Sequence, residues 1–235
     1  KKFSDLLNRY WILSNDNNLR AFCSKHNEIL VKPLDGSSGK GIYKISFNNL
    51  SDNEKEKIIT NLSQENLLIE EVLKQKGILH DLNPSSVNTM RINTLLDGEN
   101  VIFLNAFFRT GRDGQVTDNL HSGGILWQIN SETGEVRYGV RADGRFESSH
   151  PDSKIDVSGI KIPHFDEVIK LCKTAQLRTP EIPQIGWDVV ISNDYIALIE
   201  GNTASGIWDA EANRNLWKDI KRYLYKNNIE ITDKF

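Results

Sequence analysis

The sequence predicts an α+β protein built as two lobes whose strands are mostly antiparallel. Short apolar runs with a two-residue alternation are separated by turn signals such as Asp97-Gly98, a pattern typical of strands joined by hairpins. Other stretches repeat their apolar residues at helical spacing. The chain has 235 residues, 38% of them hydrophobic, which is enough for one large domain, or for one domain of two lobes, with a core of its own.

Charge and cysteine content exclude several classes of protein. The 29 basic and 32 acidic residues give a formal net charge of −3, without the basic excess of a nucleic-acid-binding protein. Cys23 and Cys172 lie far apart, so neither a disulfide framework nor a zinc site is expected, as in the reducing cytoplasm. No apolar run approaches the roughly 20 residues of a membrane span. We therefore expect a cytoplasmic protein with no nucleic-acid partner and no membrane span.

The first part of the chain predicts a helix followed by a small β-β-α-β lobe. Pro33 biases Lys32 toward an extended backbone, which ends the first strand of this lobe. Ser51 and Asp52 are suitable caps for the helix that follows the hairpin. The last strand is apolar but is interrupted by Glu70 and Glu71. The expected elements are a helix over 3–10, strands at 28–32 and 42–47, a helix beginning near 51, and a strand over 67–73.

The second part of the chain predicts a larger, mainly antiparallel sheet. Arg91 and Asn93 alternate with apolar neighbours and so lie together on one face of their strand. Residues 110–124 and 141–162 are polar and rich in turn formers, which predicts loops. The expected strands are 90–96, 101–109, 126–129, 135–140, 187–191 and 195–200, with helices over 165–175 and 212–224.

A loop rich in glycine and serine, residues 35–41, joins the two strands of the first hairpin. Its glycines would let backbone N–H groups approach an anion, and its hydroxyls would add donors. Lys32 precedes it and adds a positive charge. The loop lacks the Walker A and Rossmann spacings, and both of those motifs run from a strand into a helix. From these residues alone, a phosphate-binding loop and a plain hairpin tip both remain open.

Three side chains with oxygen donors converge on the last hairpin of the expected sheet. Glu200 and Asn202 are two residues apart on an apolar strand and therefore point to the same face, and Asp188 lies on the partner strand. Hard oxygen ligands of this kind suit Mg²⁺. A carboxylate among apolar strands is costly unless it is paired or bound to a metal, so a salt bridge from Glu200 to a buried arginine is the alternative.

Two arginines interrupt apolar strands that should be neighbours. Arg91 and Arg109 have the forked donor geometry that fits a phosphate or a carboxylate of a substrate. Salt bridges to the acids described above are the alternative, and the two readings are compatible. A solvated strand end is the simpler interpretation of Glu70 and Glu71. A lone histidine such as His121 is more often structural than catalytic.

The order of these features resembles the ATP-grasp superfamily over residues 28–206. The specific stretches are 31–41, 86–91 and the pair Ile-Gly-Trp-Asp and Glu-Gly-Asn at 185–188 and 200–202. Asn-Thr-x-Arg at 88–91 and His-Pro-Asp at 150–152 are similar to the sugar-transfer-associated branch of that superfamily. The resemblance implies the ATP-grasp fold, in which two α+β lobes with mainly antiparallel sheets grip ATP. The small lobe would cover 12–72 and carry a glycine-rich flap; the large lobe, 1–11 and 73–235, would carry the metal and substrate site.

The resemblance also implies a role for each candidate residue. Many relatives hold the ribose with an acid at the position that Gly77 occupies here, so Asp81 is the expected substitute. Lys32 would contact the phosphates of ATP beneath a flap containing Gly36, Ser37, Ser38, Gly39 and Gly41; Glu70 and the backbone of Glu71, Val72 and Leu73 would hold the adenine; Asp188, Glu200 and Asn202 would bind Mg²⁺; and Arg91, Arg109 and Asn119 would face the γ-phosphate and the acceptor.

The activity implied by the resemblance is an ATP- and Mg²⁺-dependent carboxylate–amine ligase. A substrate carboxylate would attack the γ-phosphate, and the acyl-phosphate would react with an amine to give an amide, ADP and phosphate. The family's link with bacterial surface polysaccharides points to an amino acid and a sugar acid as substrates. Two alternatives remain: a phosphotransferase that uses the same grip on ATP, and a nucleotide-binding module without catalysis. The sequence identifies neither the acceptor nor the oligomeric state.

Overall fold

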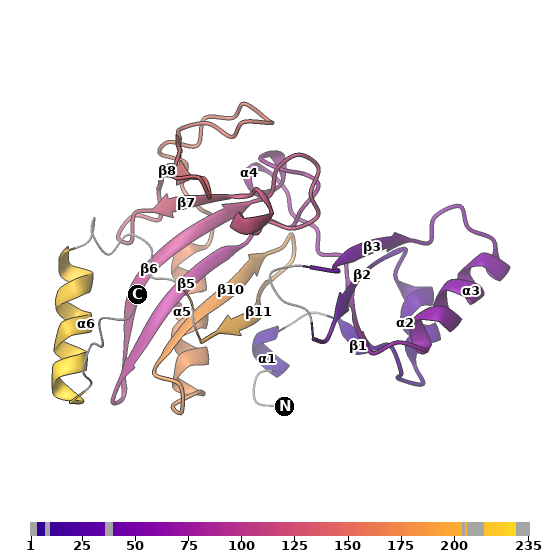
Figure 1. Ribbon diagram of the computed structural model, residues 1–235, viewed down its shortest axis with the longest axis horizontal. Coiled ribbons are helices and arrows are strands. Elements are labelled where there is room, and N and C mark those ends of the chain that lie inside the picture. Colours follow the sequence, from indigo (N-terminus) through magenta and orange to yellow (C-terminus); the bar gives the residue numbers. More distant parts are fainter. Residues whose placement is uncertain (1–3, 8–9, 36–39, 204, 206–213, 229–235) are drawn as a thin grey trace.

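Two antiparallel sheets organise the molecule. The structure is a computed structural model that describes residues 4–7, 10–35, 40–203, 205 and 214–228. One sheet has four strands in the order β1-β4-β2-β3, and the other has seven in the order β11-β10-β5-β6-β7-β8-β9. Figure 1 shows the two sheets side by side along the longest axis, with α2 and α3 at one end and α6 at the other. The expected α+β class with antiparallel strands is confirmed.

The four-stranded sheet is formed by residues 11–71, and two helices cover one of its faces. Ile29, Val31 and Ile69 are fully buried against these helices. Ser51 is the N-cap of the second of these helices, as the sequence predicts, and the structure adds a capping box between Ser51 and Glu54. The elements are β1 Trp11–Leu13, α2 Leu19–Lys25, β2 Glu28–Pro33, β3 Tyr43–Ser46, α3 Asp52–Ser63 and β4 Leu67–Glu71.

Two elements of this sheet region are absent from the sequence-based prediction. The strand β1 has only three residues, and α2 has seven residues with no side-chain cap, so neither gives a clear periodic signal. The expected β-β-α-β order is therefore wrong, and the structure has β-α-β-β-α-β. The described part of the expected N-terminal helix is also short, α1 Ser4–Leu7, and its Leu6 packs into the core of the seven-stranded sheet.

The seven-stranded sheet has one apolar face, which is covered by a long helix. That helix, α5 Phe165–Leu177, packs Val168 and Cys172 against the sheet. The Trp187 indole N–H donates to Thr94 Oγ1 at 2.9 Å, and the Thr94 hydroxyl donates to Gln176 of the helix at 2.8 Å. The strands are β5 Met90–Asp97, β6 Asn100–Thr110, β7 Ile125–Ile129, β8 Val136–Val140, β9 Phe146–Glu147, β10 Gln184–Ile191 and β11 Ile196–Asn202.

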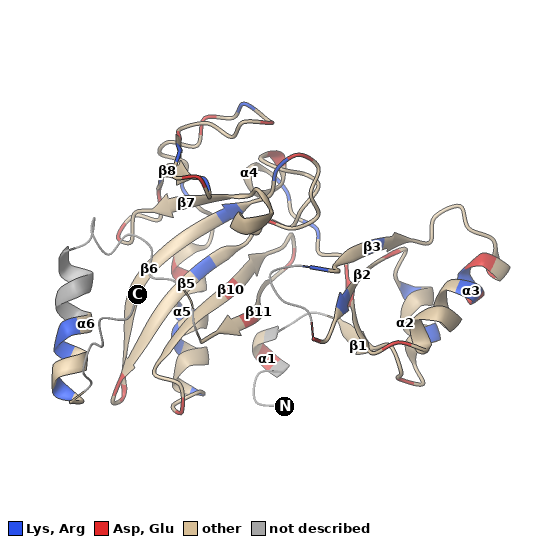
Figure 2. Ribbon diagram, in the orientation of Figure 1, with Lys and Arg blue, Asp and Glu red and all other residues tan. Residues whose placement is uncertain are grey.

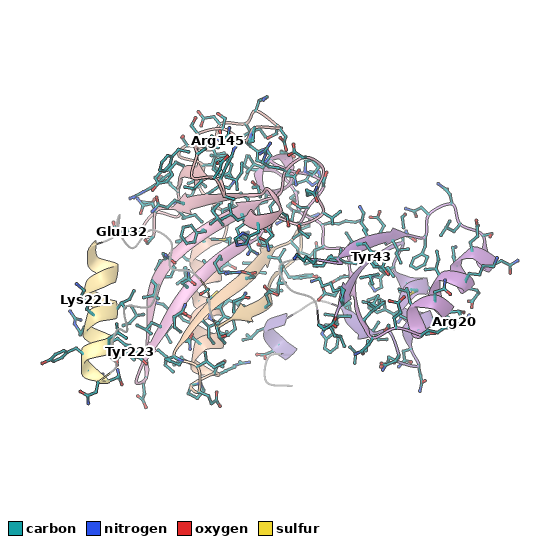
Figure 3. All side chains as sticks on the ribbon, in the orientation of Figure 1. Arg20, Tyr43, Glu132, Arg145, Lys221 and Tyr223 are labelled. Carbon is teal, nitrogen blue, oxygen red and sulfur yellow. The ribbon has the colours of Figure 1, made fainter. Side chains whose placement is uncertain are left out.

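The opposite face of this sheet carries the polar residues. Figure 2 shows one basic residue in β5 and one in β6, in strands that are otherwise tan except at their hairpin end. These are Arg91 and Arg109, the only basic residues in the two strands. Near the hairpin end of these strands, Leu95 and Leu104 form a small separate cluster with Ile220 and Tyr223 of α6 Arg214–Lys226. Figure 3 labels Tyr223 and Lys221 on this helix, at the edge of the molecule farthest from the four-stranded sheet.

The segment after β4, residues 71–75, joins the two sheets and is called the hinge segment below. The Tyr195 hydroxyl donates to Glu71 Oε1 at 2.5 Å, and the Asn193 N–H donates to the Lys74 carbonyl at 2.9 Å. The Gln75 side chain donates to the Ile191 carbonyl at 3.0 Å. The tip of the β10–β11 hairpin therefore rests on the hinge segment. The expected lobe boundaries at residues 12 and 72 stay a prediction.

Among the helices in the described ranges, none combines the length and the apolar character needed to cross a membrane.

Candidate functional site

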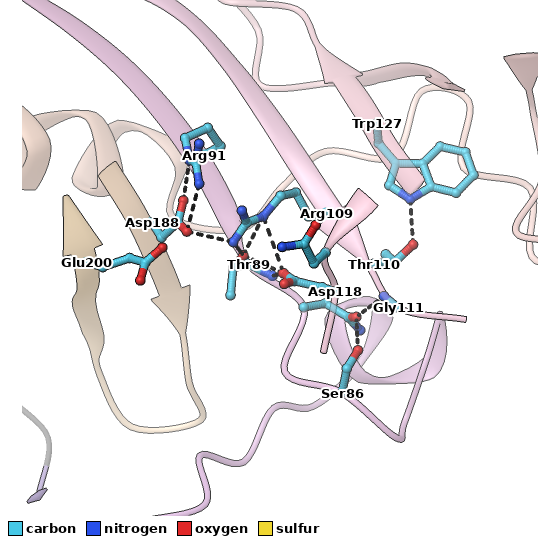
Figure 4. A network of polar contacts seen from close by, with 12 residues as sticks. Ser86, Thr89, Arg91, Arg109, Thr110, Gly111, Asp118, Trp127, Asp188 and Glu200 are labelled. Carbon is cyan, nitrogen blue, oxygen red and sulfur yellow. Dashed lines mark hydrogen bonds and ion pairs between the residues drawn. The ribbon is translucent and has the colours of Figure 1, made fainter. Parts of the chain in front are cut away.

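A buried carboxylate lies between two arginines on the polar face of the seven-stranded sheet (Figure 4). Arg91 donates through Nε to Asp188 Oδ1 and through Nη2 to Asp188 Oδ2, the latter at 2.9 Å. Arg109 Nη2 donates to the same Oδ2 atom, also at 2.9 Å. The register explains the arrangement, because Asp188 lies directly opposite Arg91 on β5. The alternative that the sequence left open, salt bridges between the two arginines and a nearby acid, is thus observed, with Asp188 rather than Glu200 as the partner of both.

A second carboxylate approaches Arg109 from the loop between β6 and β7. Asp118 Oδ2 accepts hydrogen bonds from the Thr89 backbone N–H at 2.9 Å and from the Thr89 hydroxyl at 2.5 Å. The same carboxylate oxygen is 3.5 Å from Arg109 Nε. Arg109 also donates to the Thr89 hydroxyl oxygen through Nε at 3.0 Å and Nη2 at 2.6 Å. The result is a continuous chain of alternating charges, Arg91–Asp188–Arg109–Asp118.

Burial and charge oppose each other in this chain. Burial acts to raise the pKa of Asp188, but the positive charges of Arg109 and Arg91 outweigh it and hold the pKa below its ordinary value. Burial acts to lower the pKa of Arg109, whereas the carboxylates of Asp118 and Asp188 outweigh it and raise that pKa. Both groups are therefore charged at neutral pH.

Glu200 and Asn202 lie beside Asp188 at the edge of the sheet, as the spacing predicts. Glu200 is directly opposite Asp188 on β11, and the Asn202 side-chain N–H donates to Glu200 Oε1 at 3.0 Å. The amide nitrogen of Asn202 is thereby committed, so its oxygen is the donor atom that a cation would use. Glu200 is exposed, whereas Asp188 is buried.

The fit of this set to a magnesium ion rests on its donor chemistry. No group of three His, Cys, Asp or Glu side chains within the described ranges could hold a metal. The predicted set instead offers the carboxylates of Asp188 and Glu200 and the amide oxygen of Asn202. Mg²⁺ needs only one or two carboxylates when phosphate oxygens and water complete its coordination shell. The residues fit, on the condition that a cation shares or takes over the Asp188 oxygens that the arginines contact.

On the four-stranded sheet, Lys32 and Glu70 form a buried ion pair. Lys32 Nζ is 2.5 Å from Glu70 Oε2, and the Glu70 side chain is only 3% exposed. The two residues are diagonal neighbours on adjacent strands, since Lys32 is opposite Leu68 and Glu70 is opposite Leu30. A solvated strand end, the simpler interpretation of Glu70, is therefore wrong for this residue. Glu71 points to the other face and contacts Tyr195 and the Tyr10 N–H.

A cavity of about 400 Å³ lies where the hinge segment meets the β10–β11 hairpin. It is bordered by Glu71, Val72 and Leu73, which are three of the predicted nucleotide contacts. Lys32, Glu70 and Asp81 are not among its lining residues. Asp81 ends the short helix α4 Ile78–Asp81 and is exposed. The other residues that line the cavity are Lys25, His26, Asn27, Glu28, Asn48, Lys74, Ser192, Asn193, Asp194 and Tyr195.

Most of the predicted flap lies outside the described residues, namely Gly36, Ser37, Ser38 and Gly39. Gly41 is described and has a φ of +75°, a backbone conformation that favours glycine. A Cβ at this position would lie 2.9 Å from the Pro33 ring. Glycine at position 41 therefore lets the chain that leads into β3 pass close to the end of β2.

Asn119, predicted to face the acceptor, caps a short helical turn instead of contacting the arginines. Its side-chain oxygen accepts from the His121 N–H at 2.9 Å, at the start of the 3₁₀ helix Leu120–Ser122. His121 is exposed, and its backbone N–H is the atom that Asn119 uses. The neighbouring Asp118 is the residue of this loop that reaches Arg109.

The Asp118 loop, residues 110–124, is held tightly at both ends. A Cβ on Gly111 would lie 2.6 Å from the side chains of Asn83 and Ser86, and a Cβ on Gly124 would lie 2.7 Å from the Asp118 carbonyl. Only glycine fits such close approaches. The Asn88 side chain accepts from Ser86 and from the Gly111 N–H, and it donates to the Leu79 carbonyl.

The His-Pro-Asp stretch at 150–152 supports the same loop from outside. The fully buried His150 bonds the Gly111 carbonyl through Nε2 at 3.0 Å, and Asp152 accepts from the Asp113 N–H at 2.7 Å. Because a carbonyl only accepts, His150 donates from Nε2, and its Nδ1 accepts from the Ser153 N–H at 3.4 Å.

Sequence reasoning missed two residues of the site, Thr89 and Asp118. Thr89 is itself a named residue of the Asn-Thr-x-Arg stretch at 88–91 and directly precedes the strand, so the motif was an available signal for it. Asp118 sits in a polar loop with no periodicity, and nothing local distinguishes it from Asp113.

The comparisons with known proteins agree with this architecture. The family described as sugar-transfer associated ATP-grasp matches residues 8–215. A search of the curated proteins finds no match.

Solved structures share the fold at low sequence identity. An ADP complex of N5-carboxyaminoimidazole ribonucleotide synthetase has a TM-score of 0.51 and 8% identity over 86% of this chain and 42% of its own. The N5-carboxyaminoimidazole synthetase of Staphylococcus aureus, also with ADP, has a TM-score of 0.50 and 11% identity over 87% of this chain and 42% of its own. D-alanyl-alanine synthetase A of Vibrio cholerae O1 biovar eltor str. N16961 has a TM-score of 0.50 and 13% identity over 94% of this chain and 61% of its own. The chain thus spans between 42% and 61% of the length of these relatives.

Proposed function

The chain belongs to the sugar-transfer associated ATP-grasp family, and from that premise we propose that it is an ATP- and Mg²⁺-dependent ligase that joins a carboxylate to an amine. The fold is the ATP-grasp fold, and the similar solved structures named above include synthetases crystallised with ADP. The reaction itself is our proposal. It would proceed by attack of a substrate carboxylate oxygen on the γ-phosphorus, release of ADP, and displacement of phosphate by an amine.

The observation that carries the proposal is the charged row across four neighbouring strands. Glu200, Asp188 and Arg91 lie opposite one another on β11, β10 and β5, and Arg109 on β6 reaches the same carboxylate. Acidic oxygen donors thus stand beside two fixed guanidinium groups. This combination suits the transfer of a phosphoryl group, where a cation neutralises the phosphates and arginines stabilise charge that spreads over the transferred oxygens.

Each residue has a proposed role in this reaction. Asp188, Glu200 and Asn202 would hold Mg²⁺, which when bound screens the phosphate charges. Arg91 and Arg109 would orient the acceptor carboxylate and the γ-phosphate, since a guanidinium fork matches both groups. Lys32, held by Glu70, would contact the phosphates of the nucleotide. Val72 and Leu73 of the hinge segment would contact the edge of the base. No protein nucleophile is needed.

A turnover assay tests the proposal. The protein is incubated with Mg-ATP and pools of amino acids, uronic acids and sugar nucleotides, the pools being chosen because the family is associated with sugar transfer. ADP and free phosphate are followed together. A ligase releases both, and only when a carboxylate and an amine are present.

The matched variants are Glu200→Gln and Glu132→Gln, both at exposed carboxylates; Glu132, labelled in Figure 3, lies in the turn between β7 and β8 and is not part of the charged row. We expect Glu200→Gln to lower turnover about a hundredfold and Glu132→Gln to leave it unchanged. Release of ADP without release of free phosphate would indicate a phosphotransferase instead of a ligase. Bound ATP without any turnover in every pool would favour a binding module, and failure to bind Mg-ATP at all would sink the proposal.

A further inference from the structure

The two arginines that share Asp188 are not held in the same way. Within the described ranges, Arg91 has Asp188 as its one hydrogen-bonding partner. Arg109 donates hydrogen bonds to Asp188 and to the Thr89 hydroxyl, and it also forms an ion pair with Asp118. Removal of Asp188 as a partner would therefore leave Arg91 unsupported, whereas Arg109 would keep two of its three contacts.

From this difference we infer that Asp118 is a positioning residue, which acts through the Thr89 hydroxyl to fix the Arg109 guanidinium independently of Asp188. The inference rests on the proposed function for its meaning, because Asp188 is the carboxylate that a metal ion would engage. Arg109 would then stay in place throughout the reaction, and Arg91 would be the cation that leaves Asp188.

The direction of the hydrogen bonds supports a relay from Asp118 to Arg109. A guanidinium only donates, so the Thr89 oxygen accepts from Arg109 Nε and Nη2. The single Thr89 hydroxyl proton is therefore available for Asp118, whose Oδ2 atom is 2.5 Å away. The carboxylate polarises the hydroxyl and strengthens its lone-pair contacts with the guanidinium. The Thr89 side chain thus hydrogen-bonds both charged groups, in addition to their direct contact at 3.5 Å.

Burial makes the relay strong enough to matter. The side chains of Arg109 and Asp118 are 13% and 11% exposed, so solvent screens their attraction only weakly. Loss of the Asp118 charge would leave Arg109 in contact with a single carboxylate among the described residues, the one it shares with Arg91. Together with the tie to Thr89, this makes Asp118 the permanent counter-ion of Arg109.

The backbone around Asp118 is rigid enough to serve as such a support. The Asp118 carbonyl lies 2.7 Å from where a Gly124 Cβ would be, and the loop start is pinned by His150 at Gly111. The Thr89 N–H also donates to Asp118 Oδ2, which fixes the carboxylate against β5. A loop anchored in this way can orient a side chain, whereas a loose one cannot.

The test compares Asp118→Asn, Thr89→Val and Thr89→Ser with Asp166→Asn. Asp118→Asn keeps an oxygen that can accept from Thr89 but removes the charge. Thr89→Val removes the hydroxyl, and Thr89→Ser restores it. Asp166 is an exposed acid on α5, which covers the opposite face of the sheet, so its variant is the control.

The first readout is hydrogen exchange at the arginine Nε–H groups of the free protein, measured by ¹⁵N NMR and assigned with Arg91→Lys and Arg109→Lys. We expect Asp118→Asn and Thr89→Val to speed exchange at Arg109 about tenfold, and to change exchange at Arg91 less than about twofold. Thr89→Ser and Asp166→Asn should change exchange at either arginine less than about twofold. Unchanged exchange at Arg109 in Asp118→Asn would overturn the inference. Equal acceleration at both arginines would also overturn it, since that would be general loosening of the fold.

The second readout is steady-state turnover. Misplacement of a guanidinium that acts on the reacting groups should lower kcat about 10- to 100-fold in Asp118→Asn and Thr89→Val, with the KM for Mg-ATP changed less than about threefold and with Thr89→Ser near the unsubstituted value. A rise in KM with unchanged kcat would contradict the inference. If the unsubstituted protein shows no turnover, the proposed function fails, and the exchange measurement still decides the role of Asp118.

Discussion

The two sheets treat their charged residues differently. The four-stranded sheet holds one buried ion pair, Lys32–Glu70, formed between two strands. The seven-stranded sheet holds a chain of four charges supplied by β5, β6, β10 and the loop after β6. Loss of one charge from a single ion pair affects only its immediate surroundings, whereas loss of one charge from a buried chain leaves the neighbouring charges in that chain without a partner. The difference suggests that the smaller sheet contributes one contact to the site and the larger sheet contributes its electrostatic centre.

The largest effect is expected at the centre of that chain. Asp188→Asn would leave two mostly buried arginines without their shared carboxylate, and we expect the free energy of unfolding to fall by about 3 to 5 kcal/mol. Urea denaturation followed by circular dichroism measures it. Glu200→Gln, at an exposed carboxylate in the opposite register position, should change stability by less than about 0.5 kcal/mol. Equal losses in both variants would show that the chain of charges is not a unit.

A smaller loss is expected where the loop that carries Asp118 begins. Gly111→Ala would place a Cβ 2.6 Å from the Asn83 and Ser86 side chains, and the resulting shift should cost about 2 kcal/mol. The same variant should lower turnover, because the loop holds Asp118. Thermal unfolding and the assay described above measure both. Full activity in a destabilised Gly111→Ala protein would show that turnover does not depend on the position of this loop.

Loss of the Lys32–Glu70 ion pair of the smaller sheet should cost less. Lys32→Met keeps the length of the side chain but removes the positive charge that pairs with the buried Glu70, and we expect the free energy of unfolding to fall by about 1.5 kcal/mol. Affinity for ATP should fall as well, which titration calorimetry measures. A stability loss as large as that of Asp188→Asn would mean that the two sheets hold their charges with equal strength and would remove the contrast between them.

The smallest effect concerns the histidine that supports the Asp118 loop. Burial holds the pKa of His150 below its ordinary value of 6.5. In the unfolded chain the imidazole takes up a proton as the pH falls through 6.5, whereas the folded protein keeps it neutral until its own lower pKa. Stability should therefore decline from pH 6.5 downward, by up to about 1.4 kcal/mol per pH unit, and level off below the folded pKa.

His150→Gln tests this dependence, because its amide N–H can still donate to the Gly111 carbonyl but takes up no proton. The variant should show a flatter decline of unfolding free energy between about pH 5 and 7. Asp188, whose pKa lies below 3.8, does not contribute in this range. An identical pH profile in both proteins would remove His150 as the cause.

Prediction from sequence worked best where a pattern is local. The Ser51 cap, the alternation around Arg91 and the two-residue spacing of Glu200 and Asn202 all appear in the structure as expected. It failed for β1 and α2, because three- and seven-residue elements are held by packing and carry little periodic signal of their own.

The sequence by itself determined the longer strands, their faces and the residue types that gather on the polar face. Side-chain alternation and helix capping depend on neighbours a few residues away, so they can be read along the chain. Only the tertiary structure decided that Asp188 is shared by two arginines, that Asp118 rather than Asn119 reaches Arg109, and that Thr89 links them. The physical reason is that these contacts are set by strand order and by how a loop folds back, which join residues up to 97 positions apart.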